Sequence, residues 1–157
     1  MMVNMTDRVK ILFSYEGSTA GSKDLESMWA VPTADGFRID NIPFFAYEIA
    51  TNDIVSARRD TDGMLWFETL VKGSQHSTVR LWFAKDFENE VSRVRRELRN
   101  IGCSSELSDL NRLVAVDIPP TVPYSVVRDV LDKYECEGLL EYEESCLGQA
   151  GLHKPNN

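Results

Sequence analysis

The chain has 157 residues, of which 43% are hydrophobic and 27% charged, and its net charge is −8. This composition indicates a soluble protein of one domain or two small ones, and the acidic balance argues against nucleic-acid binding because it repels phosphate. No apolar run is long enough to cross a bilayer and none lies near the first residue, so we expect a cytoplasmic protein with no membrane segment.

The first half of the chain, residues 8–73, alternates polar and apolar side chains. In "DRVKILFSYE" the apolar residues recur at every second position, which is typical of a β-strand. The segments "LESMWAVPT", "FRIDNI", "IVSARR" and "MLWFETLV" follow, separated by turns such as Ala34-Asp35-Gly36 and Asp60 to Gly63. Five short strands with regular turns predict a small antiparallel β-barrel or sandwich.

The second half, residues 74–147, mixes strands with two amphipathic helices. The strand "STVRLWFA" precedes a helix that Asp86 would cap, and its inward positions are Phe87, Val91, Val94, Leu98 and Ile101. The strands "SSELSDL" and "NRLVAVDIP" come next. A second helix follows Pro123, and "LLEYEESCL" is the last strand; the inward positions of that helix are Tyr124, Val127, Leu131 and Tyr134.

The resulting order is β-α-β-β-α-β, which predicts a ferredoxin-like half with both helices on one face of a four-stranded sheet. The fold class is therefore α+β. We expect residues 1–7 to form a disordered N-terminus and residues 148–157 a flexible tail.

Three parts of the sequence resemble one bacterial protein family. "ESMWAV", "GFRIDNIPFFAYEIATNDIV" and "SQHSTVRLWF" are similar to the domain of unknown function 4265 family over residues 25–145. The most telling pieces are the run from Asp40 to Phe44, the Asn52-Asp53 turn and the run from His76 to Arg80. That family usually has glycine at the position of Asn52 and often Ser-Gly in place of Ser74-Gln75. The resemblance implies a soluble bacterial protein and no established activity.

The run Asp40-Asn41-Ile42-Pro43-Phe44-Phe45 is a candidate wall of a site. Its polar residues could stand at the rim of a pocket walled by Phe44, Phe45 and Tyr47, or they could only bond the backbone of a turn while the phenylalanines fill the junction. The tryptophans are expected in the core, although they could stack on a flat ligand. The candidate pocket residues are Asp40, Asn41, Phe44, Phe45, Trp66, His76 and Trp82.

His76 is the candidate for nucleophilic catalysis, because Ser74, Ser77 and Thr78 surround it in the sequence. Asp40 or Asp53 could orient its ring. His76 and Ser77 point to opposite faces of a strand and no Gly-x-Ser-x-Gly motif is present, so a histidine bonded to the backbone is the default interpretation. We assign no catalytic residues.

Acidic side chains are densest near the last strand. They could form a docking face for a basic partner, or only a solvated face that protects a strand edge. This candidate partner-binding group consists of Glu135, Glu137, Glu141, Glu143 and Glu144.

The three cysteines, Cys103, Cys136 and Cys146, form no CxxC pair and are expected to be reduced. We expect no metal and no cofactor.

Two functions follow from these features. The first is a non-enzymatic interaction protein, in its sharpest form an immunity or antitoxin-like protein that binds a basic toxin domain through its acidic face. The second is a small-molecule-binding or enzymatic module with a pocket between the two halves.

Overall fold

Five strands form a closed barrel in the first half of the chain, as the alternating pattern predicts. The computed structural model describes residues 7–17 and 19–148, so most of the expected N-terminus and tail lies outside the described residues. The barrel strands are β1 (Val9–Glu16), β2 (Lys23–Pro32), β3 (Phe37–Ile39), β4 (Ile54–Arg59) and β5 (Leu65–Lys72). Neighbours pair antiparallel, but β1 closes the barrel by pairing parallel with β5, a departure from the all-antiparallel expectation.

Alternate side chains of these strands fill the barrel. Ile11 and Phe13 of β1 point inward together with Met28 and Ala30 of β2, and all four are buried. The ring of Phe13 stacks on Phe67 with centroids 4.8 Å apart. The apolar residues at every second position of the sequence are therefore the ones that point into this core.

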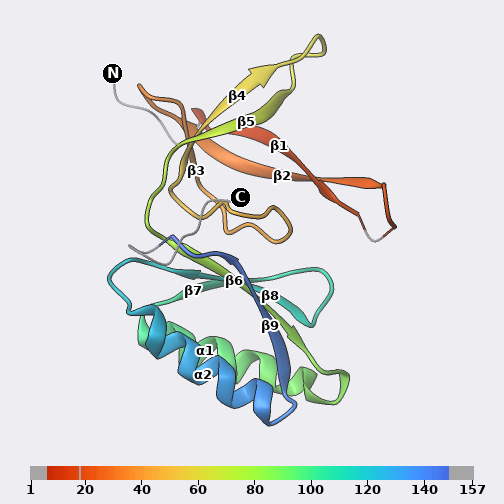
Figure 1. Ribbon diagram of the computed structural model, residues 1–157, viewed down its shortest axis with the longest axis vertical. Coiled ribbons are helices and arrows are strands. Elements are labelled where there is room, and N and C mark those ends of the chain that lie inside the picture. The colour runs from red at the N-terminus through yellow and green to blue at the C-terminus, as the bar shows by residue number, and fades with distance from the viewer. Residues whose placement is uncertain (1–6, 18, 149–157) are drawn as a thin grey trace.

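The second half is a four-stranded antiparallel sheet covered by helices. Its elements are β6 (Ser77–Phe83), the 3₁₀ helix η2 (Lys85–Glu90), α1 (Val91–Ile101), β7 (Ser104–Leu107), β8 (Leu113–Ile118), α2 (Tyr124–Cys136) and β9 (Leu140–Cys146). The strand order is β7-β8-β6-β9. Both helices lie on the side of the sheet that faces away from the barrel (Figure 1).

The helices begin differently from each other. The four inward positions of α2 are buried as predicted, but α1 begins only at Val91. Asp86 provides no side-chain cap. Phe87 has non-helical backbone angles of φ −119° and ψ 22°, and the residue is 36% exposed. The expectation that Phe87 belongs to the inward stripe is therefore wrong, while Val94 and Leu98 are fully buried.

The bridging segment, residues 40–53 between β3 and β4, lies between the barrel and the sheet (Figure 1). The amide of Glu48 donates to the carbonyl of Ser145 at 3.0 Å, and the Thr78 hydroxyl donates to the carbonyl of Ile49 at 3.2 Å. The Ser145 hydroxyl donates to the carbonyl of Ala46. The bridging segment of the barrel therefore uses its own backbone groups to bind the sheet.

Glu26 of β2 holds the bridging segment in shape. Its carboxylate accepts hydrogen bonds from the amides of Phe44, Phe45 and Ala46 at 2.7, 3.1 and 2.9 Å. Three successive amides that converge on one carboxylate fix a tight turn directly after Pro43.

None of the described helices is long and apolar enough to cross a membrane.

Candidate functional site

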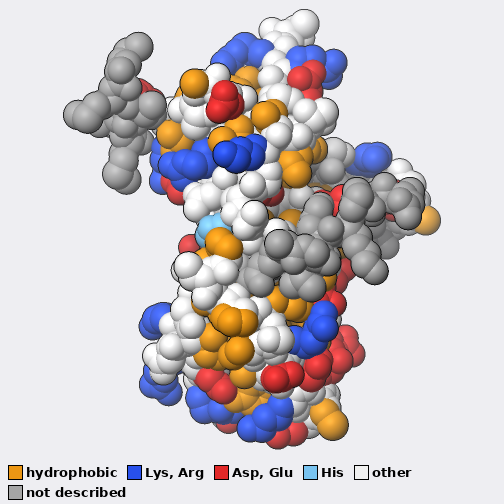
Figure 2. All heavy atoms as spheres, turned by 60° about the vertical axis from the view of Figure 1, so that its left-hand side comes forward, with side chains coloured by type: hydrophobic (Ala, Val, Ile, Leu, Met, Phe, Trp, Pro, Cys, Tyr) orange, Lys and Arg blue, Asp and Glu red, His pale blue; other side chains and the backbone are white. Residues whose placement is uncertain are grey.

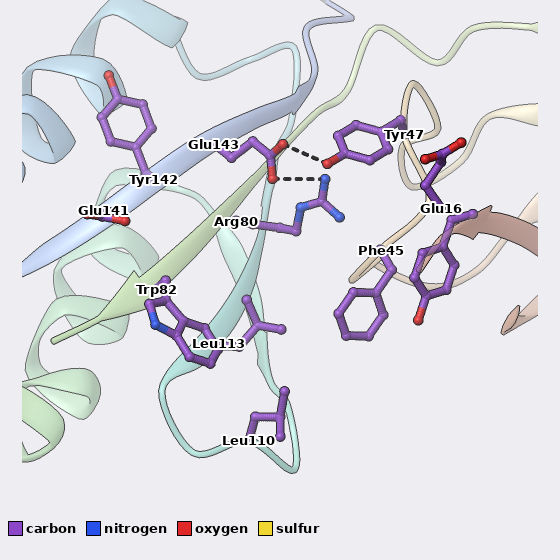
Figure 3. A pocket seen from close by; sticks show the side chains of 11 residues that line it. Glu16, Phe45, Tyr47, Arg80, Trp82, Leu110, Leu113, Glu141, Tyr142 and Glu143 are labelled. Atoms are coloured by element: carbon purple, nitrogen blue, oxygen red, sulfur yellow. Dashed lines mark hydrogen bonds and ion pairs between the residues drawn. The ribbon is translucent and has the colours of Figure 1, made fainter. Parts of the chain in front are cut away.

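A cleft of about 400 Å³ lies where the barrel meets the sheet (Figure 3). It is lined mainly by aromatic and acidic residues, and the lining comes from β1, the bridging segment, β6, β9, the β7–β8 loop and the first residue of β8. The lining residues are Tyr15, Glu16, Phe45, Tyr47, Arg80, Trp82, Leu110, Leu113, Glu141, Tyr142 and Glu143.

The two halves of the molecule each provide one wall. On the barrel side, the rings of Tyr15 and Phe45 stack with centroids 5.1 Å apart. On the sheet side, Trp82 stands next to Leu113, its partner across the β6–β8 pair (Figure 3). The opening between these walls is apolar and suits a flat or aliphatic group.

The alternation of β6 explains which side chains reach the cleft. Val79, Leu81 and Phe83 enter the core beneath the helices, so Arg80 and Trp82 face the barrel. Trp82 is 39% exposed, and the expectation that it belongs to the core is therefore wrong. The guanidinium of Arg112 lies 5.0 Å from the centre of its ring.

Arg80 is the buried charge of the cleft, with only 7% of the residue exposed. One Nη atom donates to the carbonyl of Phe44 at 2.6 Å, and the other forms an ion pair with Glu143 at 3.1 Å. Tyr47 stacks over the guanidinium and donates its hydroxyl hydrogen to Glu143 at 2.8 Å (Figure 3). This hydrogen bond, with partial burial, raises the pKa of Tyr47, so the hydroxyl remains a donor.

Two buried nitrogens of Arg80, Nε and the Nη atom that is ion-paired with Glu143, have no hydrogen-bond partner among the described residues. Buried polar groups without partners are uncommon and often indicate a missing water or ligand. The guanidinium thus carries N–H groups beneath the cleft that no described group accepts with hydrogen-bond geometry, and Nε has no ion-pair partner either.

Strand alternation divides the predicted acidic group. Glu141 and Glu143 line the cleft, where Glu16 joins them. Glu144 instead faces the helices and pairs with Arg128 at 3.2 Å. The other two lie at the end of α2, where the Glu135 carboxylate accepts from the amide of Tyr142 and Glu137 is exposed. On the face shown in Figure 2, acidic side chains of this half lie among basic and hydrophobic ones.

The seven predicted pocket residues do not converge. Phe45 and Trp82 line the cleft, and Phe44 lies beside it through contact with Phe45. Asp40 pairs with Arg8 at 3.4 Å, while the Asn41 amide oxygen accepts from the backbone of Trp29. The indole N–H of Trp66 donates to Asp60 at 2.8 Å in a barrel turn. These last three polar contacts lie within the barrel: Asn41 binds a backbone amide, whereas Asp40 binds a side chain.

His76 lies in the connection from β5 to β6, and its Nδ1 is 2.9 Å from Asp117 of β8. The carboxylate beside the ring is thus neither Asp40 nor Asp53. Burial raises the pKa of Asp117, and the bond to His76 opposes that shift. The Ser74 hydroxyl donates to the carbonyl of Thr51 and not to the ring. His76 also approaches Asn52 of the bridging segment at 3.5 Å and links the two halves.

Sequence reasoning did not identify four polar or aromatic members of the cleft: Tyr15, Glu16, Arg80 and Tyr142. The sequence did carry a signal for Arg80. A charged residue in the middle of the apolar strand "STVRLWF" must be paired where it is buried.

The described residues contain no group of three or more His, Cys, Asp or Glu side chains placed to bind a metal ion.

Comparison with known proteins gives the family and the fold. A family model described as "Domain of unknown function (DUF4265)" matches residues 26–142, most of the chain. The chain is similar to a hypothetical protein from Neisseria gonorrhoeae of known crystal structure, with 27% identity, a TM-score of 0.74, and 91% of this chain and 97% of that chain covered. None of the curated proteins compared with it matches. On the extent of the family match, the chain belongs to the DUF4265 family.

Proposed function

We propose that this protein is a non-enzymatic binding protein that captures a basic group of a partner protein in the cleft between barrel and sheet. The observation that carries the proposal is the composition of the cleft: aromatic walls with the carboxylates of Glu16, Glu141 and Glu143, against Arg80 as the one cation among the described lining residues. Because Arg80 is already paired with Glu143, the carboxylates of Glu16 and Glu141 remain for a ligand.

Lysine and arginine side chains satisfy both features of this cleft. Their aliphatic stems can pack between Phe45 and Trp82, and their charged ends can reach a carboxylate. An aromatic face also attracts a cation within about 6 Å. The net charge of −8 favours approach of a basic partner over long range.

The proposal places the protein in the cytoplasm and includes an immunity or antitoxin-like role, in which the basic partner is a toxin domain. It also assigns the second half to the ferredoxin-like folds. The strand order β7-β8-β6-β9 and the position of both helices on one face support this assignment.

A second candidate is a small organic cation as the ligand. The cleft volume of about 400 Å³ and the stacked rings of Tyr15 and Phe45 favour it, because such a space encloses a small molecule on several sides.

Calorimetry with synthetic peptides tests the proposal. The probe alternates lysine and leucine, and its control carries glutamate in place of each lysine. Binding of the lysine peptide is expected to weaken about tenfold in the variants Glu141→Lys and Glu16→Lys, and to be unchanged in Glu68→Lys on the barrel exterior. Equal binding of both peptides, or no effect of Glu141→Lys, would refute a cationic ligand in the cleft. Glu143 is left intact because Arg80 needs it.

A further inference from the structure

A second hollow of about 590 Å³ adjoins the cleft. It is lined by Ala84, Glu135, Gly138 and Leu140, and it shares Trp82, Glu141 and Tyr142 with the cleft. Trp82 and Glu141 are directly paired across β6 and β9. The two hollows therefore meet at one rung of the sheet and form one continuous path, which we call the groove.

The groove follows the β6–β9 pair. It passes from the rung of Arg80 and Glu143 through that of Trp82 and Glu141 to Ala84 beyond the end of β6. Four residues of strand correspond to about 13 Å, and the hollows extend past both ends, so the groove suits about five to seven residues of extended chain. Within the described residues β9 is an edge strand, so no further strand lies along its outer side.

Negative charge recurs along the groove. Glu16 stands at its barrel end, Glu141 at its middle and Glu135 at its far end. The C-terminal end of α2, at Cys136, adds the negative end of a helix dipole close to Glu135. Cationic side chains at intervals would meet a carboxylate at each hollow.

The unused N–H of Arg80 distinguishes a peptide from a simple polyamine. A polyamine offers no acceptor, whereas each peptide unit carries a carbonyl oxygen. Tyr47 stacks over the guanidinium and is 55% exposed, so a peptide carbonyl could approach the buried Nε–H where the peptide displaces this ring.

We infer that the occupant of the groove is an extended, basic segment of the partner protein, with one cationic side chain at Glu141 and a second at Glu135. This inference rests on the proposed function and adds the form of the ligand. It identifies Glu135 as a contact for long ligands only.

Two lysine-containing peptides, of about seven and about three residues, separate these claims, and their affinities are measured by fluorescence anisotropy. The variant Glu141→Gln is expected to weaken both peptides. Glu135→Gln should weaken only the long peptide, by about three- to fivefold. Glutamine at 135 can still accept the hydrogen bond from Tyr142, and Glu137→Gln is the matched control at the same helix end.

The outcomes are distinct. If Glu141→Gln weakens both peptides but Glu135→Gln weakens neither, the extended segment is refuted and the proposed function stands. If spermine binds as tightly as the long peptide, the role of the peptide carbonyl is refuted. If no lysine peptide binds better than its glutamate counterpart, the proposed function fails as well.

Discussion

The guanidinium of Arg80 and the carbonyl of Phe44 are 2.6 Å apart, and this hydrogen bond joins the centre of the sheet to the bridging segment of the barrel. Arg80 is buried and its charge is balanced by Glu143 across the same rung. The pair therefore belongs to the junction between the halves as well as to the cleft.

Replacement of Arg80 tests this role. Arg80→Ala is expected to lower the free energy of unfolding by about 2 kcal/mol, because the half-buried carbonyl of Phe44 and the exposed carboxylate of Glu143 lose their shared donor. Arg80→Lys should lose less, since one ammonium keeps the charge but cannot replace the planar fork. Urea denaturation measures both variants, and Arg58→Ala on the barrel surface is the control. A loss equal to that of the control would mean that Arg80 does not hold the junction.

Glu26 makes an equally specific prediction. Glu26→Ala removes the acceptor of three amides and is expected to cost about 3 kcal/mol of stability. Glu26→Gln retains one acceptor oxygen and should cost about half as much. Thermal unfolding followed by circular dichroism gives both values. An alanine variant as stable as the parent would show that these amides find other acceptors.

Gln75 has a left-handed backbone with φ of 67°. Because this conformation strains any residue with a Cβ, Gln75→Gly is expected to stabilise the protein by about 0.5–1 kcal/mol. Gln75→Ala keeps the strain and serves as the matched control, with a change near zero. Chemical denaturation compares the two, and a destabilised glycine variant would contradict the argument. Asn52, with φ of 69°, is less suitable because its side chain also binds Arg38.

The cysteines should differ in reactivity. Burial raises the pKa of Cys103 to about 11 and that of Cys146 to about 12, whereas Cys136 is exposed. At about pH 8 we expect Cys136 to react quickly with a thiol reagent and the other two only after unfolding, because the thiolate is the reactive form. Mass spectrometry after timed alkylation locates the labels. Rapid labelling of Cys103 or Cys146 in the folded state would contradict their burial.

The same shifts affect stability at high pH. A folded-state pKa above the ordinary value of 9.0 means that the folded protein holds these protons more tightly than the unfolded chain. The contribution of both thiols is therefore complete below pH 9.0 and declines as the pH rises through about 11 to 12. The variant Cys103→Ala should show a smaller loss of stability over that range.

Local periodicity was sufficient to predict most elements of this fold. The period of two gives the barrel strands, and the stripe of Val127, Leu131 and Tyr134 gives α2. The start of α1 could not be predicted because Phe87 fits the helical stripe yet has non-helical backbone angles. The two glycine positions implied by the family resemblance, Asn52 and Gln75, do have positive φ.

The site was harder to predict because it depends on contacts between distant segments. Phe45 and Trp82 were named as candidate walls and do face each other across the cleft. His76 was grouped with them, but the connection after β5 directs it toward Asp117. Glu26 looks like a surface residue of an alternating strand, and only the position of the bridging segment reveals its three partners. Such pairings have no local signature in the sequence.

The two walls of the cleft belong to different halves of one molecule, which has a mechanical consequence. The distance between Phe45 and Trp82 depends on how the barrel is oriented relative to the sheet, and the bridging segment between them determines this orientation. A molecule inserted there acts as a wedge that locks that orientation. Ligand binding and the association of the two halves are then thermodynamically coupled, so a change that stabilises the contact between barrel and sheet also raises the affinity for the ligand.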